Sequence, residues 1–246
     1  MAQSLPLLNT LRLTGNLVWK NRAAIAWLVV AAAVVKSTAT WLAFKLLDPL
    51  EAAGLYKILS LLVYTLLAVN VHRVLLRAEN PVLSRWTMRE TRFLGWLLVI
   101  YVYFALIFAL FGLVIGSVTE DPLDFIDGGW TAVLAFLLLG LPGAYLGARL
   151  SMLLPATAVD KRQGFAWSWA LTDGNGLRLV ALLWVLPFVY PMLIPNWVAD
   201  NAVLYLAASL VHSAGTALEV ALLSAAFSTL GGLTFNGASQ EQTQHS

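Results

Sequence analysis

A few ionisable and polar side chains interrupt the long apolar stretches of this sequence. They are Lys36, Asn70, Arg73, Arg149, His212 and Glu219. A charged group at the centre of a bilayer costs ~2.5–3.5 kcal/mol on insertion scales, so each one needs a partner or a path to water. A buried carboxylate and an imidazole can exchange protons near neutral pH. The first chemistry to consider is therefore proton or cation movement through Glu219 and His212.

Glu219 and His212 lie two helical turns apart on one face of the last apolar stretch. If this face points into a helix bundle, we expect Glu219 to form a buried ion pair with Arg149 or Arg73. Such a pair would tie the last helix to an earlier one. Two alternatives stay open: Glu219 and His212 line a proton or cation path, or Glu219 points into water.

Arg73 and Arg149 each precede the expected end of an apolar stretch by several residues. At ~1.5 Å of rise per residue, both lie roughly 9–14 Å inside the membrane boundary. An arginine at this depth can snorkel, with its stem in hydrocarbon and its guanidinium at headgroup phosphates, which is the alternative to pairing with Glu219. Lys36 has no acidic partner on a shared face and indicates a cavity or an incorrectly drawn span. Asn70 is expected to hydrogen-bond across helices.

No catalytic, cofactor or metal site is predicted from the sequence. Serine and histidine occur without a supporting acid at usable spacing, cysteine is absent, and possible metal ligands are too few. The run "TDGNG" at 172–176 is a weak candidate for a phosphate-binding loop. Asp173 would repel an anion there, and the two glycines are explained as a helix stop.

The composition predicts the elements that must position these residues. Of 246 residues, 60% are hydrophobic and 11% are charged, and the mean hydropathy is +0.78. Soluble domains average about 45–50% apolar and 25% charged residues. The apolar residues fall into blocks of about 20 or more, the length that an α-helix needs to cross a bilayer. We therefore predict an all-α, multi-pass membrane protein.

Six transmembrane helices are predicted within a domain at residues 23–232. The expected spans are 23–47, 55–76, 93–118, 130–154, 177–198 and 202–230. Lys36 interrupts the first span, which predicts a tilt, a kink or a re-entrant section there. Three prolines at 187, 191 and 195 predict a bend in the fifth. Residues 1–22 are expected to form an amphipathic helix in the membrane interface, with Trp19 as an anchor, and residues 233–246 a disordered tail.

Basic residues alternate with acidic ones along the connections between spans. The connections expected on one side contain Arg12, Lys20, Arg22, Arg73, Arg77, Arg85, Arg89, Arg92, Arg149, Lys161, Arg162 and Arg178. The opposite loops contain Asp48, Glu51, Glu120, Asp121, Asp124, Asp127 and Asp200. By the positive-inside rule, both termini are cytoplasmic. The pI near 9.0 is explained by these loops, so membrane lipids are expected partners and nucleic acid is not.

Small residues predict close helix packing in the fourth span. Gly143 and Gly147 have the spacing of a GxxxG motif, and Gly140 lies one turn earlier. Such residues let helix backbones approach in lipid, where water supplies no hydrophobic driving force. We expect packing within the chain, with homodimerisation as the alternative.

The runs "RLSMLLPATAVD" and "SWALTDGNGLRL" resemble segments of uncharacterised bacterial inner-membrane proteins. Those proteins are related to the membrane domain of glycerophosphoryl diester phosphodiesterases. The resemblance is strongest over residues 145–186, and it implies a bacterial inner-membrane protein. It does not imply the phosphodiesterase activity, which belongs to a separate soluble barrel of roughly 250 residues. With six spans in 246 residues, we expect no such domain here.

Three classes of function follow from these observations. The absence of a catalytic set favours a non-catalytic membrane module, a scaffold or accessory subunit that packs against lipid or protein partners. The intramembrane ionisable residues and the proline-rich fifth span suggest instead a small permease or a proton- or ion-coupled channel that uses Glu219 and His212. An intramembrane lipid-processing enzyme is the third class.

Overall fold

Every regular element in the part of the chain that the structure describes is a helix. The computed structural model describes residues 5–83, 85–116, 136–185 and 202–231. The elements are α1 (Leu7–Lys20), α2 (Arg22–Leu46), α3 (Pro49–Arg77), α4 (Met88–Gly116), the π-helical turn η1 (Phe136–Gly140), α6 (Leu141–Leu150), α7 (Leu153–Ala158), α8 (Phe165–Leu171), α9 (Gly176–Val180), the π-helical turn η2 (Ala181–Val185) and α11 (Ala202–Thr229). The predicted all-α class is confirmed over these residues.

Five stretches among the described residues are long and apolar enough to cross a bilayer. They are Arg22–Leu46, Leu50–Arg77, Met88–Val114, Leu137–Ala158 and Val203–Thr229. They overlap the first, second, third, fourth and sixth predicted spans. Of the fifth predicted span, residues 177–185 are described, within α9 and η2, and its three prolines lie outside the described residues. The predicted disordered tail also lies outside them.

The first span is continuous at Lys36, because α2 is one α-helix of 25 residues through this position. The prediction of a re-entrant section at this position is therefore wrong. Helices α2 and α11 pack closely against each other, and both carry buried alanines, Ala32 and Ala33 on α2 and Ala217 and Ala221 on α11. Small side chains allow such an approach.

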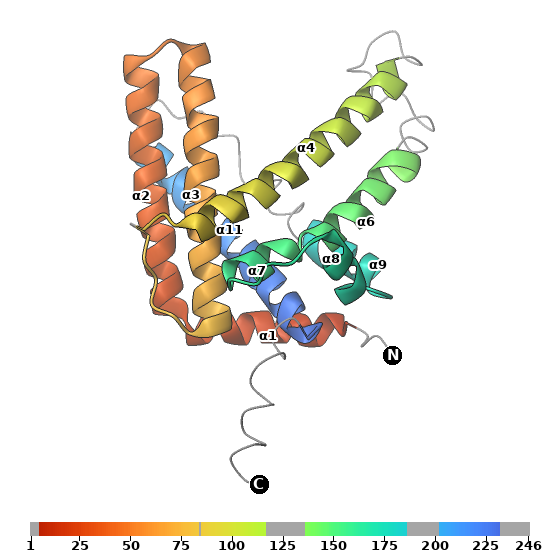
Figure 1. The fold of residues 1–246 in the computed structure, drawn as a ribbon. Coiled ribbons are helices and arrows are strands. Elements are labelled where there is room, and N and C mark those ends of the chain that lie inside the picture. Colours follow the sequence, from red (N-terminus) through yellow and green to blue (C-terminus); the bar gives the residue numbers. More distant parts are fainter. Residues whose placement is uncertain (1–4, 84, 117–135, 186–201, 232–246) are drawn as a thin grey trace.

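The helices form two groups that meet at one end of the molecule (Figure 1). Helices α2, α3 and α11 pack together, while α4 and α6 lean away from α2 and α3. Helix α1 crosses the lower end of the first group and packs against α11. The same end carries the last turns of α3 and α11 and the short helices α7, α8 and α9. We call it the α1 end.

The side of α1 that faces the rest of the protein contains polar groups, and these groups are hydrogen-bonded. Thr10 and Thr14 are buried, and their hydroxyls donate to backbone oxygens one turn earlier, at 2.9 and 2.8 Å. The backbone N–H of Leu5 donates to Asn175 Oδ1 at 2.7 Å, which holds the start of α1 to the turn between α8 and α9. Leu8 and Trp19 are exposed. Arg12, Asn16 and Lys20 are also exposed, so the exposed positions of α1 mix apolar and polar groups, and its placement in the membrane interface stays a prediction.

Candidate functional site

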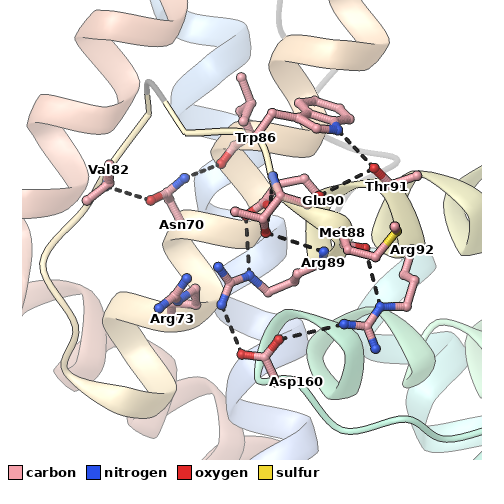
Figure 2. A network of polar contacts seen from close by, with 12 residues as sticks. Asn70, Arg73, Val82, Trp86, Met88, Arg89, Glu90, Thr91, Arg92 and Asp160 are labelled. Atoms are coloured by element: carbon pink, nitrogen blue, oxygen red, sulfur yellow. Dashed lines mark hydrogen bonds and ion pairs between the residues drawn. The ribbon is translucent and has the colours of Figure 1, made fainter.

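Charged side chains from three segments converge at the α1 end (Figure 2). They are Arg73, Arg77 and Glu79 around the end of α3, Arg89, Glu90 and Arg92 in the first turns of α4, and Asp160 after α7. We call this group the arginine network. Because α3, α4 and α7 each contribute to it, the network fixes where the two helix groups meet.

Asp160 accepts contacts from three arginines at once. Its Oδ2 accepts a hydrogen bond from Arg89 Nη1 at 2.9 Å, and Arg77 Nη1 lies 3.8 Å from the same oxygen. Arg92 Nη2 lies 4.0 Å from Oδ1. The carboxylate is half exposed, so each contact is weak by itself. Together they hold the ends of α3 and α4 against the segment after α7.

The backbone around Asp160 explains how its carboxylate comes to lie there. Helix α7 ends in a Schellman motif, in which the Lys161 N–H donates to Ala156 O at 2.9 Å and the Asp160 N–H donates to Thr157 O at 3.0 Å. The motif requires a left-handed residue, and Asp160 has φ 62°. Glycine would relieve that strain but would bring no carboxylate to the three arginines.

The start of α4 is fixed by a capping box. Glu90 Oε2 accepts hydrogen bonds from the Thr87 N–H at 2.7 Å and from the Thr87 hydroxyl. The Arg89 N–H donates to Thr87 Oγ1 at 3.3 Å. Glu90 is 3% exposed, and its Oε1 lies 3.3 Å from Arg89 Nε. Thr87 and Glu90 therefore satisfy two amide groups at the start of α4, and the contact of Glu90 with Arg89 orients the guanidinium that binds Asp160.

Arg73 forms an ion pair with Glu79, two residues beyond the end of its own helix. The expected ion pair of Arg73 with Glu219 is therefore not formed. The neighbouring Arg77 donates to the backbone oxygen of Val159, which adds a direct link from α3 to the end of α7. Both arginines act within the arginine network.

Arg149 is enclosed by the segment that follows its own helix. Its Nε donates to Thr172 Oγ1 at 2.7 Å, its Nη1 donates to the Tyr145 hydroxyl at 3.0 Å, and its Nη2 donates to the Trp169 backbone oxygen. The Trp169 ring lies 3.7 Å from the guanidinium carbon, and Arg149 is 4% exposed. Both expectations for this residue are wrong: the guanidinium neither reaches outward to headgroups nor pairs with Glu219. It clamps α6 to α8.

Asn70 binds a loop rather than another helix. Its Oδ1 accepts from the Val82 N–H at 2.8 Å, and its Nδ2 donates to Leu66 O within α3 at 2.8 Å (Figure 2). The expected hydrogen bond across helices is therefore replaced by one that holds the α3–α4 connection against α3.

Lys36, His212 and Glu219 lie apart from the arginine network, in the contact region of α2, α3 and α11. Lys36 is 8% exposed, and its Nζ lies 5.3 Å from the Tyr56 ring centroid. It interacts electrostatically with His212 across the α2–α11 contact. Glu219 is half-buried and makes no ion pair with a cation of the described residues. Its carboxylate interacts electrostatically with Tyr64. Lys36 thus lies within electrostatic range of His212, and neither Arg73 nor Arg149 forms an ion pair with Glu219.

A buried histidine that the sequence did not single out links α3 to α11. His72 Nδ1 lies 2.7 Å from Ser224 Oγ, whose hydroxyl donates to Val220 O at 2.8 Å. The serine proton is used in the second bond, so His72 Nδ1 carries the proton of the first. Nε2 is buried and has no hydrogen-bond partner among the described residues. The pair is a structural link between helices.

The glycines of the predicted packing motif face α4. A Cβ at Gly147 would lie 2.1 Å from Phe104 Cζ, and one at Gly143 would lie 3.1 Å from Ile107 Cγ2. The Tyr103 hydroxyl donates to Gly143 O at 3.2 Å. Gly140 ends the η1 turn. These contacts bring α6 close to α4 within one chain.

A groove of about 600 Å³ opens beside the arginine network, between α4 and the segment after α7. We call it the α4–α7 groove. Its lining includes Arg92, Trp96, Val99, Thr157, Lys161 and Arg162. Burial, and then the positive charge of Arg77, lower the pKa of Lys161 below the usual lysine range. Three cationic side chains, Arg92, Lys161 and Arg162, therefore line one end of the groove.

Sequence reasoning missed the residues that organise this site. Thr87 and Glu90 had a usable signal, because "TMRE" ahead of an apolar run is a capping-box pattern. Asp160 had no such signal, because no local sequence pattern predicts that an aspartate in a left-handed conformation will contact arginines from two other helices. Among the described residues there is no group of three or more side chains that could hold a metal ion.

Comparison of the chain with protein families, with characterised proteins and with solved structures finds no match.

Proposed function

We propose that this chain is a non-catalytic, multi-pass protein of the bacterial cytoplasmic membrane that serves as a scaffold or accessory module for lipid or protein partners. The observation that carries the proposal is the surface of α4. Its outer half is apolar on all sides and open, with Leu106 65% and Leu113 71% exposed. A helix of this kind needs a cover of acyl chains or of another protein's helices.

The polar contacts support a structural role. Arg149, Asn70 and His72 each hold one segment of the chain to another, and the arginine network joins three segments. Chemistry on a substrate would require some of these groups to face a cavity with other reactive groups beside them. Their hydrogen bonds and ion pairs are instead made within the chain.

The proposed placement has the α1 end in the cytoplasm. Helix α1 lies in the interface, the arginine network and Lys161 lie at the cytoplasmic headgroups, and both termini are cytoplasmic. The alternation of basic and acidic connections and the resemblance of residues 145–186 to bacterial inner-membrane proteins support this placement.

A small permease is the second candidate function, and Lys36 is the observation that favours it. This lysine is buried inside a candidate span and makes no ion pair with a carboxylate of the described residues. Buried hydroxyls of Ser37 and Thr40 lie on the same helix, and the buried hydroxyl of Ser213 lies on α11, which packs against it. An ionisable group at such a depth is a frequent marker of a substrate or proton pathway.

A photo-crosslinking experiment tests the scaffold proposal. A photoreactive amino acid is placed at Leu106 or Leu113 of the full chain in cells, with buried Leu97 of the same helix as the matched position. We expect a discrete protein or phospholipid adduct from the two exposed positions and none from Leu97. Mass spectrometry of the adduct identifies the class of partner.

Flux through reconstituted vesicles separates the two candidates. The scaffold proposal expects no proton or cation flux above that of protein-free vesicles. A flux that falls about tenfold or more in Glu219→Gln or Lys36→Met would overturn it and support the permease. Glu51→Gln and Lys45→Met change the same kinds of charge at exposed positions of α3 and α2 and serve as controls.

A further inference from the structure

The α4–α7 groove changes from cationic to apolar along its length. Arg92, Trp96 and Val99 follow each other on one face of α4, at i, i+4 and i+7, and cover ~10 Å of the helix axis. Lys161 and Arg162 form the opposite wall beside Arg92 at the α1 end. A ligand that fits must therefore be anionic at one end and apolar at the other.

The cationic end has more positive charge than its carboxylates neutralise. Asp160 is shared by Arg77, Arg89 and Arg92, and Glu90 is bound by Thr87 and Arg89. Arg92 Nη2 lies 4.0 Å from Asp160 Oδ1, and Arg92 Nε donates to the Met88 backbone oxygen. A guanidinium has five N–H donors, so Arg92 retains capacity for an anion.

Lys161 adds a further positive charge to this end of the groove. Its lowered pKa reports burial together with repulsion from Arg77, and an anion bound beside it would relieve that repulsion. Arg162 is exposed at the rim of the groove, where its guanidinium can close over a bound anion.

The apolar end is built from aromatic and aliphatic groups. The Trp96 ring meets the Phe165 ring edge-on, with centroids 5.0 Å apart, and Val99 lies one turn further along α4. Phe165 begins α8 and is half exposed. Phe165 packs against Trp96 and holds its ring in place, so Trp96 and Val99 give the groove an apolar lining beyond the cations, as suits an acyl chain that leaves a headgroup.

The geometry points to a binding site for one anionic phospholipid in the α4–α7 groove, with the headgroup phosphate at Arg92, Lys161 and Arg162 and an acyl chain along Trp96 and Val99. The inference rests on the proposed function in one respect, the placement of the α1 end at a membrane surface. A basic pocket between helices at the cytoplasmic surface suits such headgroups. A free phosphate would use the cations and leave the apolar wall uncovered.

Native mass spectrometry of the full chain in a mild detergent tests the site. Dioleoyl-phosphatidylglycerol is compared with dioleoyl-phosphatidylcholine, which has the same acyl chains and no net charge. We expect one tightly bound phosphatidylglycerol per chain. The double variant Arg92→Gln, Lys161→Gln should bind it about tenfold more weakly or worse, because two phosphate contacts are lost. The variant Arg12→Gln, Lys20→Gln removes the same charge from exposed positions of α1 and should bind as the unchanged chain does.

Two further measurements make the result decisive. Arg162→Gln, at an exposed position outside every helix, should weaken binding severalfold without affecting the fold, and circular dichroism checks the helix content of all variants. Val99→Trp should weaken phosphatidylglycerol binding by narrowing the apolar end. Equal binding of the two lipids, equal losses in both double variants, or full displacement by millimolar inorganic phosphate would each overturn the site. Resistance of the chain to alkaline extraction from membranes is scored separately, so failure of the membrane placement is distinguished from failure of the lipid site.

Discussion

Arg149 brings a full positive charge into the interior of the molecule, and its surroundings match the planar shape of a guanidinium. Three different nitrogens donate to Thr172, to Tyr145 and to the Trp169 backbone oxygen, while the Trp169 ring covers one face. Neutral oxygens and a ring face together replace the water that the group has lost. A lysine ammonium has its three donors on one nitrogen and cannot reach all three acceptors, which are spread around the planar guanidinium.

Replacing Arg149 with lysine tests this clamp. We expect Arg149→Lys to lower the free energy of unfolding by about 2–3 kcal/mol, because buried acceptors lose their donors and the Trp169 ring loses its stacked partner. Denaturation in detergent micelles, followed by circular dichroism, measures the change. Arg178→Lys, at an exposed position of α9, should change it by less than about 0.5 kcal/mol. Equal stability of the two variants would contradict the clamp.

Sequence reasoning identified Arg149 as a costly residue but gave it the wrong partners. Opposite charge suggested Glu219, whereas the structure uses a hydroxyl, a phenol and a backbone oxygen from residues within 23 positions. Neutral acceptors of this kind occur throughout the chain, so the sequence does not indicate which of them Arg149 binds. For the same reason the ion pair of Arg73 with Glu79 was missed, since it depends on how the chain turns after α3.

At the scale of elements, the glycines of α6 decide how closely it approaches α4. The Phe104 ring occupies the space over Gly147 where any other residue would have its Cβ. Residue 147 is buried, so the contact is made in the interior and not at a lipid-facing surface. This contact and the arginine network are separate links between α4 and the segments that follow it.

Gly147→Ala should push α4 away from α6. The added Cβ would lie 2.1 Å from Phe104 Cζ, so we expect a loss of about 1–3 kcal/mol in unfolding free energy. Gly112→Ala on α4, with no atom within 4 Å of its added Cβ, should be neutral or stabilise by about 0.5–1 kcal/mol through helix propensity.

A second substitution, Phe104→Ala, shows whether Gly147→Ala destabilises the protein through a steric conflict with the Phe104 ring or through a general loss of packing. If the conflict is with the Phe104 ring, Phe104→Ala should recover part of the stability lost in Gly147→Ala, although Phe104→Ala alone should destabilise the protein. A double-mutant cycle measures this coupling. Additive losses in the cycle would show that the two residues do not meet.

The long helices could be predicted because hydropathy is a local property, and five of the expected spans coincide with described helices. The arrangement of the chain after Leu150 could not be predicted in this way. The sequence there divides into α7, α8 and α9, and each break depends on contacts made elsewhere: the left-handed Asp160 on the arginines, and Gly176 on the Tyr145 ring that lies against it. Hydropathy therefore locates the apolar stretches, the count of six spans stays a prediction, and the positions of the connectors depend on contacts that the sequence does not reveal.

For the whole molecule, the direction of each long helix constrains the number of membrane crossings. In Figure 1, α3 and α11 both run toward the α1 end, and α7 also lies at that end. The six-span prediction adds to the five candidate spans one crossing at residues 177–198. Six crossings would put both termini on the same side.

Single-cysteine labelling tests this topology, and the chain suits it because it contains no cysteine. We predict that a membrane-impermeant maleimide labels Glu51→Cys and Glu120→Cys in intact cells. Arg85→Cys and Ser239→Cys should react only after permeabilisation, because the connection after α3 and the tail follow an even number of crossings. Labelling of Ser239→Cys from outside, with Arg85→Cys still protected, would give five crossings and overturn the six-span topology. Labelling of Arg85→Cys from outside, with Glu51→Cys protected, would reverse the orientation and place the arginine network and the α4–α7 groove at the outer surface.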